Sequence, residues 1–439
     1  MERGLIAKAV LCGALLAPAQ SRAADLMEVF REAERSDPEY AQVQAATRAT
    51  LEQKPQARAL LLPFLDFTYS TQHNDQDIDS DFGTSGRIDF QSTNWSADLT
   101  QPIFRLGRVF GLRQANSNIL QADAQLSGAL QDLMVRTANR YFNVLAAMDT
   151  LEFTRTARRA LGRQLEQARK RFEVGVSAIT DVQEAQAGFD RAVAAEIRAE
   201  NDLDNANERL REITGTYFPA LAPLVAENMP LTPPDPANID EWTRVTLEQN
   251  LRVQAAQHAT ETARLEIRRV ASEGWLPTAD LVGSYNFRDS GGQFGSETET
   301  GSIGVEVNVP IFEGGGAVSR TREARALHRE SLELLTQEQR TAQRETREAY
   351  LGVMSGISGI KALEQAVVSS ETALEATRAG FDVGTRTAVD VVEAERRLAE
   401  AKRDLARARY DYIVDTLRLK RAAGTLSPND LQLVNAWLQ

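Results

Sequence analysis

Residues 171–185 read RFEVGVSAITDVQEA and residues 380–394 read GFDVGTRTAVDVVEA, so one motif occurs twice, 209 positions apart. In each copy a Val-Gly pair ends a run of helix-forming residues, and an Asp-Val pair follows shortly after. Glycine allows the left-handed conformation that ends many helices, and aspartate favours the start of the next helix. The motif therefore predicts two helix-to-helix turns, at Val174-Gly175 and at Val383-Gly384. A purely structural helical hairpin would explain the motif equally well.

The spacing of the prolines shows how long these helices are. There is no proline between Pro102 and Pro219, or between Pro310 and Pro428. Both stretches are rich in Ala, Leu, Gln, Glu and Arg, which favour helices. Each stretch can hold two helices of about 40 to 60 residues, a length typical of coiled-coil-like packing.

Two pairs of segments with alternating polarity precede the helical stretches. This period of two predicts strands with one apolar and one polar face, at about 62–104 and about 276–312. The polar stretches 73–92 and 289–300 are expected to be the connecting loops. The alternation is clearest at Leu65, Phe67, Tyr69, Trp95, Ala97, Leu99, Ile303, Val305 and Val307.

The polar face of these strands carries carboxylates, at Asp66, Asp98, Asp280 and Glu306. Such a face suits a barrel whose outside meets lipid and whose inside meets water, although an exposed sheet in a soluble domain is the alternative. Four strands cannot close a barrel, because the smallest spanning barrels have about eight. An open edge in lipid leaves backbone groups unpaired, so the chain is expected to oligomerise. Two copies would fill the interior with side chains, whereas three would leave an aqueous lumen.

Composition excludes several classes of protein. Residues 1–23 have the basic start, apolar run and small residues of a secretory signal peptide, and Cys12 within it is the chain's one cysteine. No disulfide or thiol chemistry is therefore expected in the mature chain. No later stretch reaches about 18 consecutive apolar residues. The net charge of −12 argues against nucleic acid as a partner.

These patterns divide the chain into five parts. The signal peptide (1–23) is followed by a first repeat at 24–218, a linker or collar at 219–240, a second repeat at 241–426 and a tail at 427–439. Each repeat is expected to contain a helix, a strand pair and a long helix pair, and the tips of the helix pairs lie at 172–181 and 381–390. The duplication places both tips at the same end of the molecule, away from the strands.

The hairpin motif resembles the signature of TolC-type outer-membrane efflux proteins, Val-Gly-x5-Asp-Val-x2-Ala. The first copy matches it at Val174, Gly175, Asp181, Val182 and Ala185, and the second at Val383, Gly384, Asp390, Val391 and Ala394. The resemblance extends over nearly all of the chain after the signal peptide.

This resemblance implies the fold and the function. The expected fold is mainly α-helical with four transmembrane strands per chain, and a homotrimer forms a 12-stranded β-barrel continued by a periplasmic helical barrel. The expected function is a passive outer-membrane duct for drugs or secreted proteins, not an enzyme. The implied partners are a periplasmic adaptor, which binds the hairpin tips, and an inner-membrane efflux pump or ABC exporter.

The resemblance also implies a gate at the tips. Arg386 matches an arginine that links to an aspartate on the first hairpin, which matches Asp181 beside Thr180. Phe381 stands where the family has a tyrosine, so the hydroxyl link is missing and the closed state is expected to depend more on Arg386 and Asp181. Asp390 and Glu393 match a ring of carboxylates at the constriction, which would favour cations. Solvated carboxylates at a helix tip are the alternative.

Other patterns predict no metal, cofactor or catalytic site. The run of aspartates at 75–81 lacks the glycine and distal glutamate of an EF-hand, and the three histidines lack the spacing of a zinc site. Two other classes of protein fit less well. A periplasmic adaptor would have one hairpin rather than two, and a general porin would have many strands in one chain.

Overall fold

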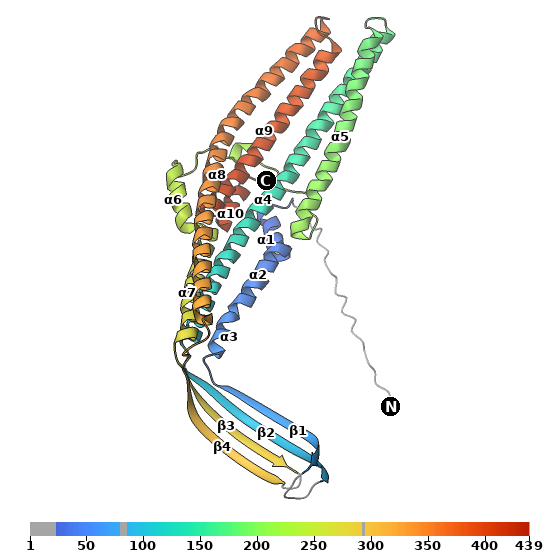
Figure 1. The fold of residues 1–439 in the computed structure, drawn as a ribbon. Coiled ribbons are helices and arrows are strands. Elements are labelled where there is room, and N and C mark those ends of the chain that lie inside the picture. Colours follow the sequence, from blue (N-terminus) through green and yellow to red (C-terminus); the bar gives the residue numbers. More distant parts are fainter. Residues whose placement is uncertain (1–22, 80–85, 292–294, 439) are drawn as a thin grey trace, which may run out of the picture.

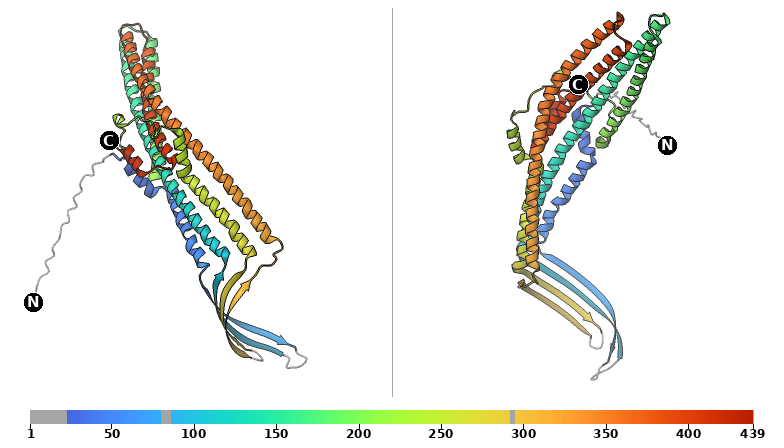
Figure 2. Two further views of the ribbon diagram at one scale, coloured as in Figure 1. Left: turned by 90° about the vertical axis from the view of Figure 1, so that its left-hand side faces the viewer. Right: turned by 45° about the horizontal axis from the view of Figure 1, so that its top comes forward.

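The computed structural model describes residues 23–79, 86–291 and 295–438, in which long helices continue from a curved four-stranded sheet (Figure 1). The sheet lies at one end of the molecule, and two helical hairpin tips lie at the opposite end (Figure 2). The predicted signal peptide falls outside the described residues, apart from Ala23. The predicted fold class, mainly helical with four strands per chain, is confirmed.

The four strands form one antiparallel sheet in the order β1-β2-β3-β4. This order leaves β1 and β4 as the two edges of the sheet within one chain. The strands are β1 (Phe64–Ile78), β2 (Gly86–Phe104), β3 (Thr278–Ser290) and β4 (Ser296–Asn308).

The register of the sheet puts the alternating apolar residues on one face. Phe67 lies opposite Ala97, Trp95 lies opposite Phe287, and the Trp95 ring stacks on Phe287 with 5.8 Å between ring centroids. Among the described residues this face is largely exposed, and Ile303 on β4 is 80% exposed. Carboxylates lie on the other face, where Asp66 is opposite Asp98. The sheet therefore has the two unlike faces that the alternation predicts.

The strands are longer than the sequence predicts. Most of the expected loop 73–92 is strand, because β1 continues to Ile78 and β2 begins at Gly86. The expected loop 289–300 is likewise mostly strand. In these extensions most residues are polar, and the few apolar ones, Ile78, Ile88 and Phe90, lie on the face that carries Asp66 and Asp98, so the apolar face ends while the backbone ladder continues.

Helices make up most of the rest of the described chain. Among the described helices, none has both the length and the apolar composition needed to cross a membrane. Those of the first half are α1 (Leu26–Ser36), α2 (Pro38–Leu51), α3 (Gln53–Ala59), α4 (Leu106–Glu173) and α5 (Ile179–Thr214). The second half has α6 (Ile239–Gln249), α7 (Leu251–Trp275), α8 (Gly316–Asp382), α9 (Ala388–Ala423) and α10 (Pro428–Asn435), and the short 3-10 turn η1 (Ala226–Asn228) lies between the halves.

Two helices run nearly the whole length of the helical part. With 68 and 67 residues, α4 and α8 are each about 100 Å long at the usual rise per residue. Near the sheet they pack with α7, and toward the tips α4 pairs with α5 while α8 pairs with α9 (Figure 1). The molecule therefore ends in two helical hairpins, α4–α5 and α8–α9.

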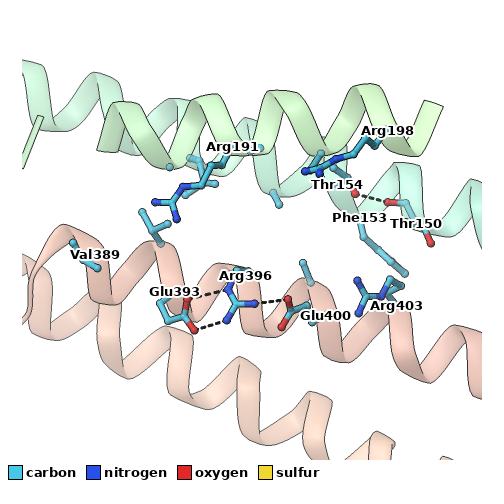
Figure 3. A pocket seen from close by; sticks show the side chains of 17 residues that line it. Thr150, Phe153, Thr154, Arg191, Arg198, Val389, Glu393, Arg396, Glu400 and Arg403 are labelled. Atoms are coloured by element: carbon cyan, nitrogen blue, oxygen red, sulfur yellow. Dashed lines mark hydrogen bonds and ion pairs between the residues drawn. The ribbon is translucent and has the colours of Figure 1, made fainter. Parts of the chain in front are cut away.

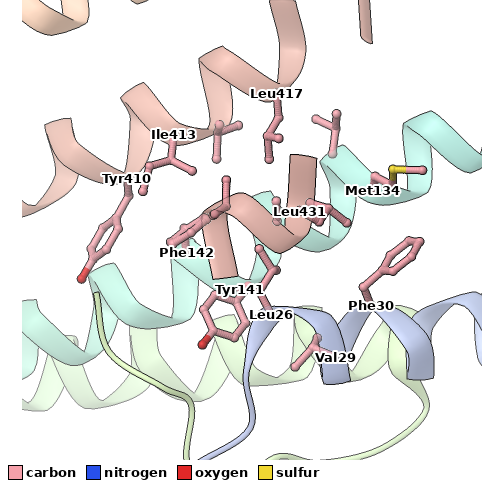
Figure 4. Packing of buried hydrophobic residues seen from close by; sticks show 14 of the residues in the cluster. Leu26, Val29, Phe30, Met134, Tyr141, Phe142, Tyr410, Ile413, Leu417 and Leu431 are labelled. Carbon is pink, nitrogen blue, oxygen red and sulfur yellow. The ribbon is translucent and has the colours of Figure 1, made fainter. Parts of the chain in front are cut away.

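The main hydrophobic core lies midway between the sheet and the tips, where α1, α4, α9 and α10 meet (Figure 4). Tyr141 and Phe142 of α4 are fully buried there, beside Leu417 of α9. The Tyr141 hydroxyl donates to the carbonyl of Ala222 at 2.7 Å, and burial raises the pKa of this phenol. The core thus ties the N-terminal helices and the segment around Ala222 to the long helices.

A buried ion pair supports the same region. Asp37, which precedes α2, has only 1% of its side chain exposed. Its carboxylate accepts the backbone N–H of Tyr40 at 2.7 Å and two N–H groups of Arg136, both at 3.0 Å. A buried carboxylate needs all of these donors to offset its loss of hydration. Arg136 is therefore essential for the packing of α2 against α4.

Candidate functional site

The two hairpin tips have the same backbone design. Gly175 has a φ of 75° and Gly384 a φ of 79°, the left-handed conformation that ends a helix with little strain only at glycine. The N–H that follows each glycine donates back to the last helical turn at 2.8 Å, from Val176 to Arg171 and from Thr385 to Gly380. The glycine of the motif therefore ends a long helix at each tip, as predicted from the sequence.

The valine before each of these glycines points into solvent. The exposed fraction is 73% for Val174 and 76% for Val383. Each tip thus presents an exposed apolar side chain at the far end of the molecule.

The helices that leave the tips begin differently. α9 begins with a capping box, in which the Asp390 carboxylate accepts the N–H and the hydroxyl of Thr387 at 2.9 and 3.0 Å. These hydrogen bonds, with the charge of Arg386, lower the pKa of Asp390. Thr180 and Asp181 lie in the first turn of α5, where no side chain caps the helix. Asp390 is therefore a fixed anion, while Asp181 is held less tightly.

The sequence-predicted pair of Arg386 and Asp181 is not formed within one chain. Arg386 instead folds back over its own turn, so that a Cβ added at Gly380 would lie 2.7 Å from its Cγ. Among the described residues, Arg386 forms no ion pair with a carboxylate, and neither does Asp181 with a basic group. Both charges are thus available to a second chain.

Phe381 contacts Arg171 of the other hairpin, an interaction that was not predicted from the sequence. The guanidinium carbon of Arg171, on α4, lies 5.0 Å from the centroid of the Phe381 ring, on α8. This is a cation–π geometry, and it joins the last turns of both long helices. An arginine and a phenylalanine occur in both copies of the motif region, but nothing in their spacing shows that the two helices bring this pair together.

Two further contacts join the hairpins near Arg171 and Phe381. Gln164 of α4 donates from its side-chain amide to the carbonyl of Ala388, the first residue of α9, at 2.9 Å. Gly188 of α5 packs so closely on Val392 that an added Cβ would lie 3.2 Å from a methyl carbon. The two hairpins are therefore held together near the tips.

Farther from the tips, the hairpins enclose a cavity of about 410 Å³ (Figure 3). Its lining includes apolar side chains such as Phe153, Leu161 and Val392, together with charged ones from both hairpins. Arg191 and Arg198 of α5 face α9 across this cavity. Among the described residues, neither of these two arginines forms an ion pair with a carboxylate.

Glu393 lies on the opposite wall and is surrounded by arginines of its own helix. Its carboxylate accepts two N–H groups of Arg396, at 2.6 and 2.9 Å, and one of Arg397 at 3.1 Å. The hydrogen bond from Arg396, with that from Arg397, lowers the pKa of Glu393 to about 2. Arg396 also pairs with Glu400 (Figure 3).

At the end nearer the core, hydrogen bonds again join the two hairpins, among them one from Arg407 of α9 to the side-chain oxygen of Asn143 of α4 at 2.7 Å. The Tyr410 hydroxyl of α9 donates to Asp149 of α4 at 2.6 Å. Burial raises the pKa of Asp149, and the hydrogen bond from Tyr410 opposes this rise. The link therefore lies where the hairpins separate from the core, and it stabilises a carboxylate that burial disfavours.

We expect Tyr410→Phe to destabilise the protein by about 1–2 kcal/mol, because the half-buried Asp149 carboxylate loses its donor. The loss should be smaller at pH 4 than at pH 8, since a protonated Asp149 has no charge to stabilise. Thermal unfolding of the detergent-solubilised protein measures both effects. Tyr217→Phe, at an exposed tyrosine, is the matched control. Equal losses in the two variants, or a loss that grows in acid, would contradict this role.

The described residues contain no group of three or more His, Cys, Asp or Glu side chains that could hold a metal ion. The three histidines lie on separate elements, at His73 in β1, His258 in α7 and His328 in α8.

Comparison with known proteins gives concordant matches. The profile of the family described as outer membrane efflux protein matches residues 29–216 and 242–425. The outer membrane protein TolC of Vibrio cholerae is 39% identical over 425 residues, covering 95% of this chain and 94% of that protein. The alkaline protease secretion protein AprF of Pseudomonas aeruginosa is 30% identical, covering 94% and 86%. Among solved structures, the outer membrane protein VceC of Vibrio cholerae has a similar fold, with a TM-score of 0.76 at 19% identity over 91% of this chain and 96% of that one.

Proposed function

The chain belongs to the outer membrane efflux protein family, and from this membership we propose that three copies assemble into one export duct with a gate at the hairpin tips. Family membership places the protein in the Gram-negative outer membrane, with a periplasmic extension, as an efflux or secretion channel. The proposal adds the number of chains, the gate and the partners. It also assigns the protein no catalytic role, because its matched relatives are channels.

The sheet is the observation that supports assembly most strongly. Its apolar face is exposed, and β1 and β4 each leave an edge with unpaired backbone groups. In lipid each unpaired group costs several kcal/mol, so β4 of one copy is expected to pair with β1 of the next. Two copies would close a barrel filled by side chains, whereas three give twelve strands and an aqueous lumen.

The helices support a tunnel that continues from this barrel. Residues 24–218 and 241–426 are proposed as two repeats of one unit, joined by a collar segment at 219–240 and followed by a tail at 427–439. Each repeat contributes one strand pair and one hairpin that ends in the same direction (Figure 2). Three chains would then surround a tunnel with six hairpins, and the tips would meet at its periplasmic end.

The gate is proposed to consist of Thr180, Asp181, Phe381, Arg386, Asp390 and Glu393. Within one chain Arg386 and Asp181 have no ion-pair partner among the described residues, and both lie near the tips. We therefore assign their link to neighbouring chains, where Arg386 of one copy meets Asp181 of the next.

Arg386→Ser is expected to raise the single-channel conductance modestly. An exposed ion pair is worth about 0–1 kcal/mol, and three copies act together on one gate. Planar-bilayer recording measures the effect, and Arg322→Ser, an exposed arginine on α8 far from the tips, is the control. An unchanged conductance in Arg386→Ser would refute the link.

Recruitment is proposed to occur at the exposed tip residues Val174, Gly175, Val383 and Gly384. The bound partner is a periplasmic adaptor with its inner-membrane efflux pump or ABC exporter. An exposed apolar side chain on a rigid turn is a suitable anchor for a partner helix.

Crosslinking tests the function and the recruitment together. The only cysteine is Cys12, so a cysteine introduced at Val383 would be unique in the processed chain. Val383→Cys is expected to crosslink to an adaptor in cells and to co-purify its pump, whereas Leu433→Cys, exposed on α10, is not. Deletion of the gene should abolish export of the cargo of that pump. Export that continues without this protein would contradict the proposal.

A further inference from the structure

Of the two carboxylates proposed for the constriction, Asp390 and Glu393, it is Glu393 that forms ion pairs with arginines. Arg396 and Arg397 stand three and four positions after it, so all three side chains share one face of α9. Three N–H groups of the two arginines donate to the Glu393 carboxylate at 2.6, 2.9 and 3.1 Å. Two guanidinium groups thus surround one carboxylate.

The two arginines are not equally free to neutralise Glu393. Arg396 also pairs with Glu400, one turn farther along the helix. Arg397 has 69% of its side chain exposed, and among the described residues Glu393 is its one ion-pair partner. Arg397 therefore adds a positive charge that no second carboxylate of the helix offsets.

The other charged residues around Glu393, Arg396 and Arg397 do not make the net charge of this region negative. Arg386 lies close enough to Asp390 for its charge to lower the pKa of that carboxyl. Around the start of α9 four carboxylates (Asp390, Glu393, Glu395 and Glu400) are accompanied by Arg386, Arg396 and Arg397, and Glu395 is paired with a fourth arginine, Arg378 of α8. Arg191 and Arg198 face the same cavity as Glu393 from the opposite wall (Figure 3).

We propose that Arg397, together with Arg396, cancels the negative charge of Glu393 at the constriction, so that the channel discriminates little between cations and anions. This inference rests on the proposed function, which places α9 at the constriction. It names Arg397 as a residue that determines selectivity, and it predicts that anionic cargo passes the gate without strong repulsion. Charges within about 8–10 Å of a narrow aperture act on passing ions at physiological salt, so this local balance decides selectivity.

The reversal potential of reconstituted channels in a KCl gradient tests the proposal. The wild-type K⁺/Cl⁻ permeability ratio is expected to lie near about one, because the charges at the start of α9 balance. Arg397→Gln keeps the helix and the length of the side chain but removes one positive charge per chain. Its permeability ratio should shift roughly three- to tenfold toward K⁺. Glu393→Gln should shift the ratio toward Cl⁻, because it leaves both arginines without that carboxylate.

Arg322→Gln is the matched control, since it removes the same charge from an exposed site on α8 far from the tips, and it should leave the ratio unchanged. A wild-type channel with strong cation selectivity would overturn the proposal, as would conducting Arg397→Gln and Glu393→Gln channels with the wild-type ratio. If no protein conducts, wild type included, the proposed function fails and this inference fails with it. Conducting channels with unaltered selectivity contradict the inference alone.

Discussion

Phe381→Ala is expected to raise the single-channel conductance several-fold, the largest effect of any single substitution at the tips. The variant removes the ring over which the Arg171 guanidinium lies, and with it the contact between the last turns of α4 and α8. The lost cation–π attraction and apolar contact amount to roughly 1–3 kcal/mol per chain. Because three copies hold one gate, the open state should gain three times this amount, whereas Arg386→Ser removes only exposed ion pairs.

Two variants separate this contact from a general effect of losing an aromatic ring. Phe172 is 43% exposed at the tip of the first hairpin, so Phe172→Ala should leave the conductance unchanged. Phe381→Tyr keeps a ring under Arg171 and should stay closed. Arg171→Gln should act like Phe381→Ala, and combining the two should add little, since both remove one interaction. A wild-type conductance in a folded Phe381→Ala channel would show that the contact does not hold the gate.

Arg136→Leu is expected to destabilise each chain by about 3–5 kcal/mol, the largest effect on stability among these variants. The substitution leaves the Asp37 carboxylate buried, with 1% of its side chain exposed and two of its three donors lost. A buried charge without its partner costs far more than the pair itself contributes. Urea unfolding, followed by the helical circular dichroism signal of the detergent-solubilised protein, measures the loss.

The double variant Asp37→Asn with Arg136→Leu tests the cause of this loss. Asparagine caps a helix about as well as aspartate, so the N-terminus of α2 keeps its cap while the buried charge is removed. The double variant should therefore be more stable than Arg136→Leu alone. Arg159→Leu, at an exposed arginine of the same helix, should change the stability by less than about 0.5 kcal/mol. If the double variant is as unstable as Arg136→Leu alone, the loss of stability comes from lost packing and not from the buried charge.

The parts of the fold that depend on local chemistry could be predicted from the sequence. Gly175 and Gly384 mark both turns because only a residue without a side chain adopts their positive φ easily. The two faces of the sheet follow from the period of two, since each side chain direction alternates along a strand. The strand ends could not be predicted, because beyond the apolar region most residues are polar and the few apolar ones, such as Ile88 and Phe90, fall on the opposite face, while the hydrogen-bonded ladder continues.

The contacts of the candidate gate depend on how two hairpins pack, and they could not be read from the sequence. Arg171 and Phe381 are 210 positions apart, and whether they meet depends on the rotation of α4 against α8. The resemblance drew attention to Phe381 but described it only as a missing hydroxyl. The resemblance likewise draws attention to Glu393 for its charge alone, whereas Arg396 and Arg397, which donate to its carboxylate, follow three and four positions later.

The central claim is that three chains form one pore that their hairpin tips keep closed. The most direct measurement combines native mass spectrometry and bilayer recording on one detergent-solubilised sample of the processed protein. The account predicts particles of three chains with a small conductance, and a several-fold larger conductance for Phe381→Ala particles of the same mass. Particles of one or two chains, or three-chain particles that conduct no ions in either form, would contradict it.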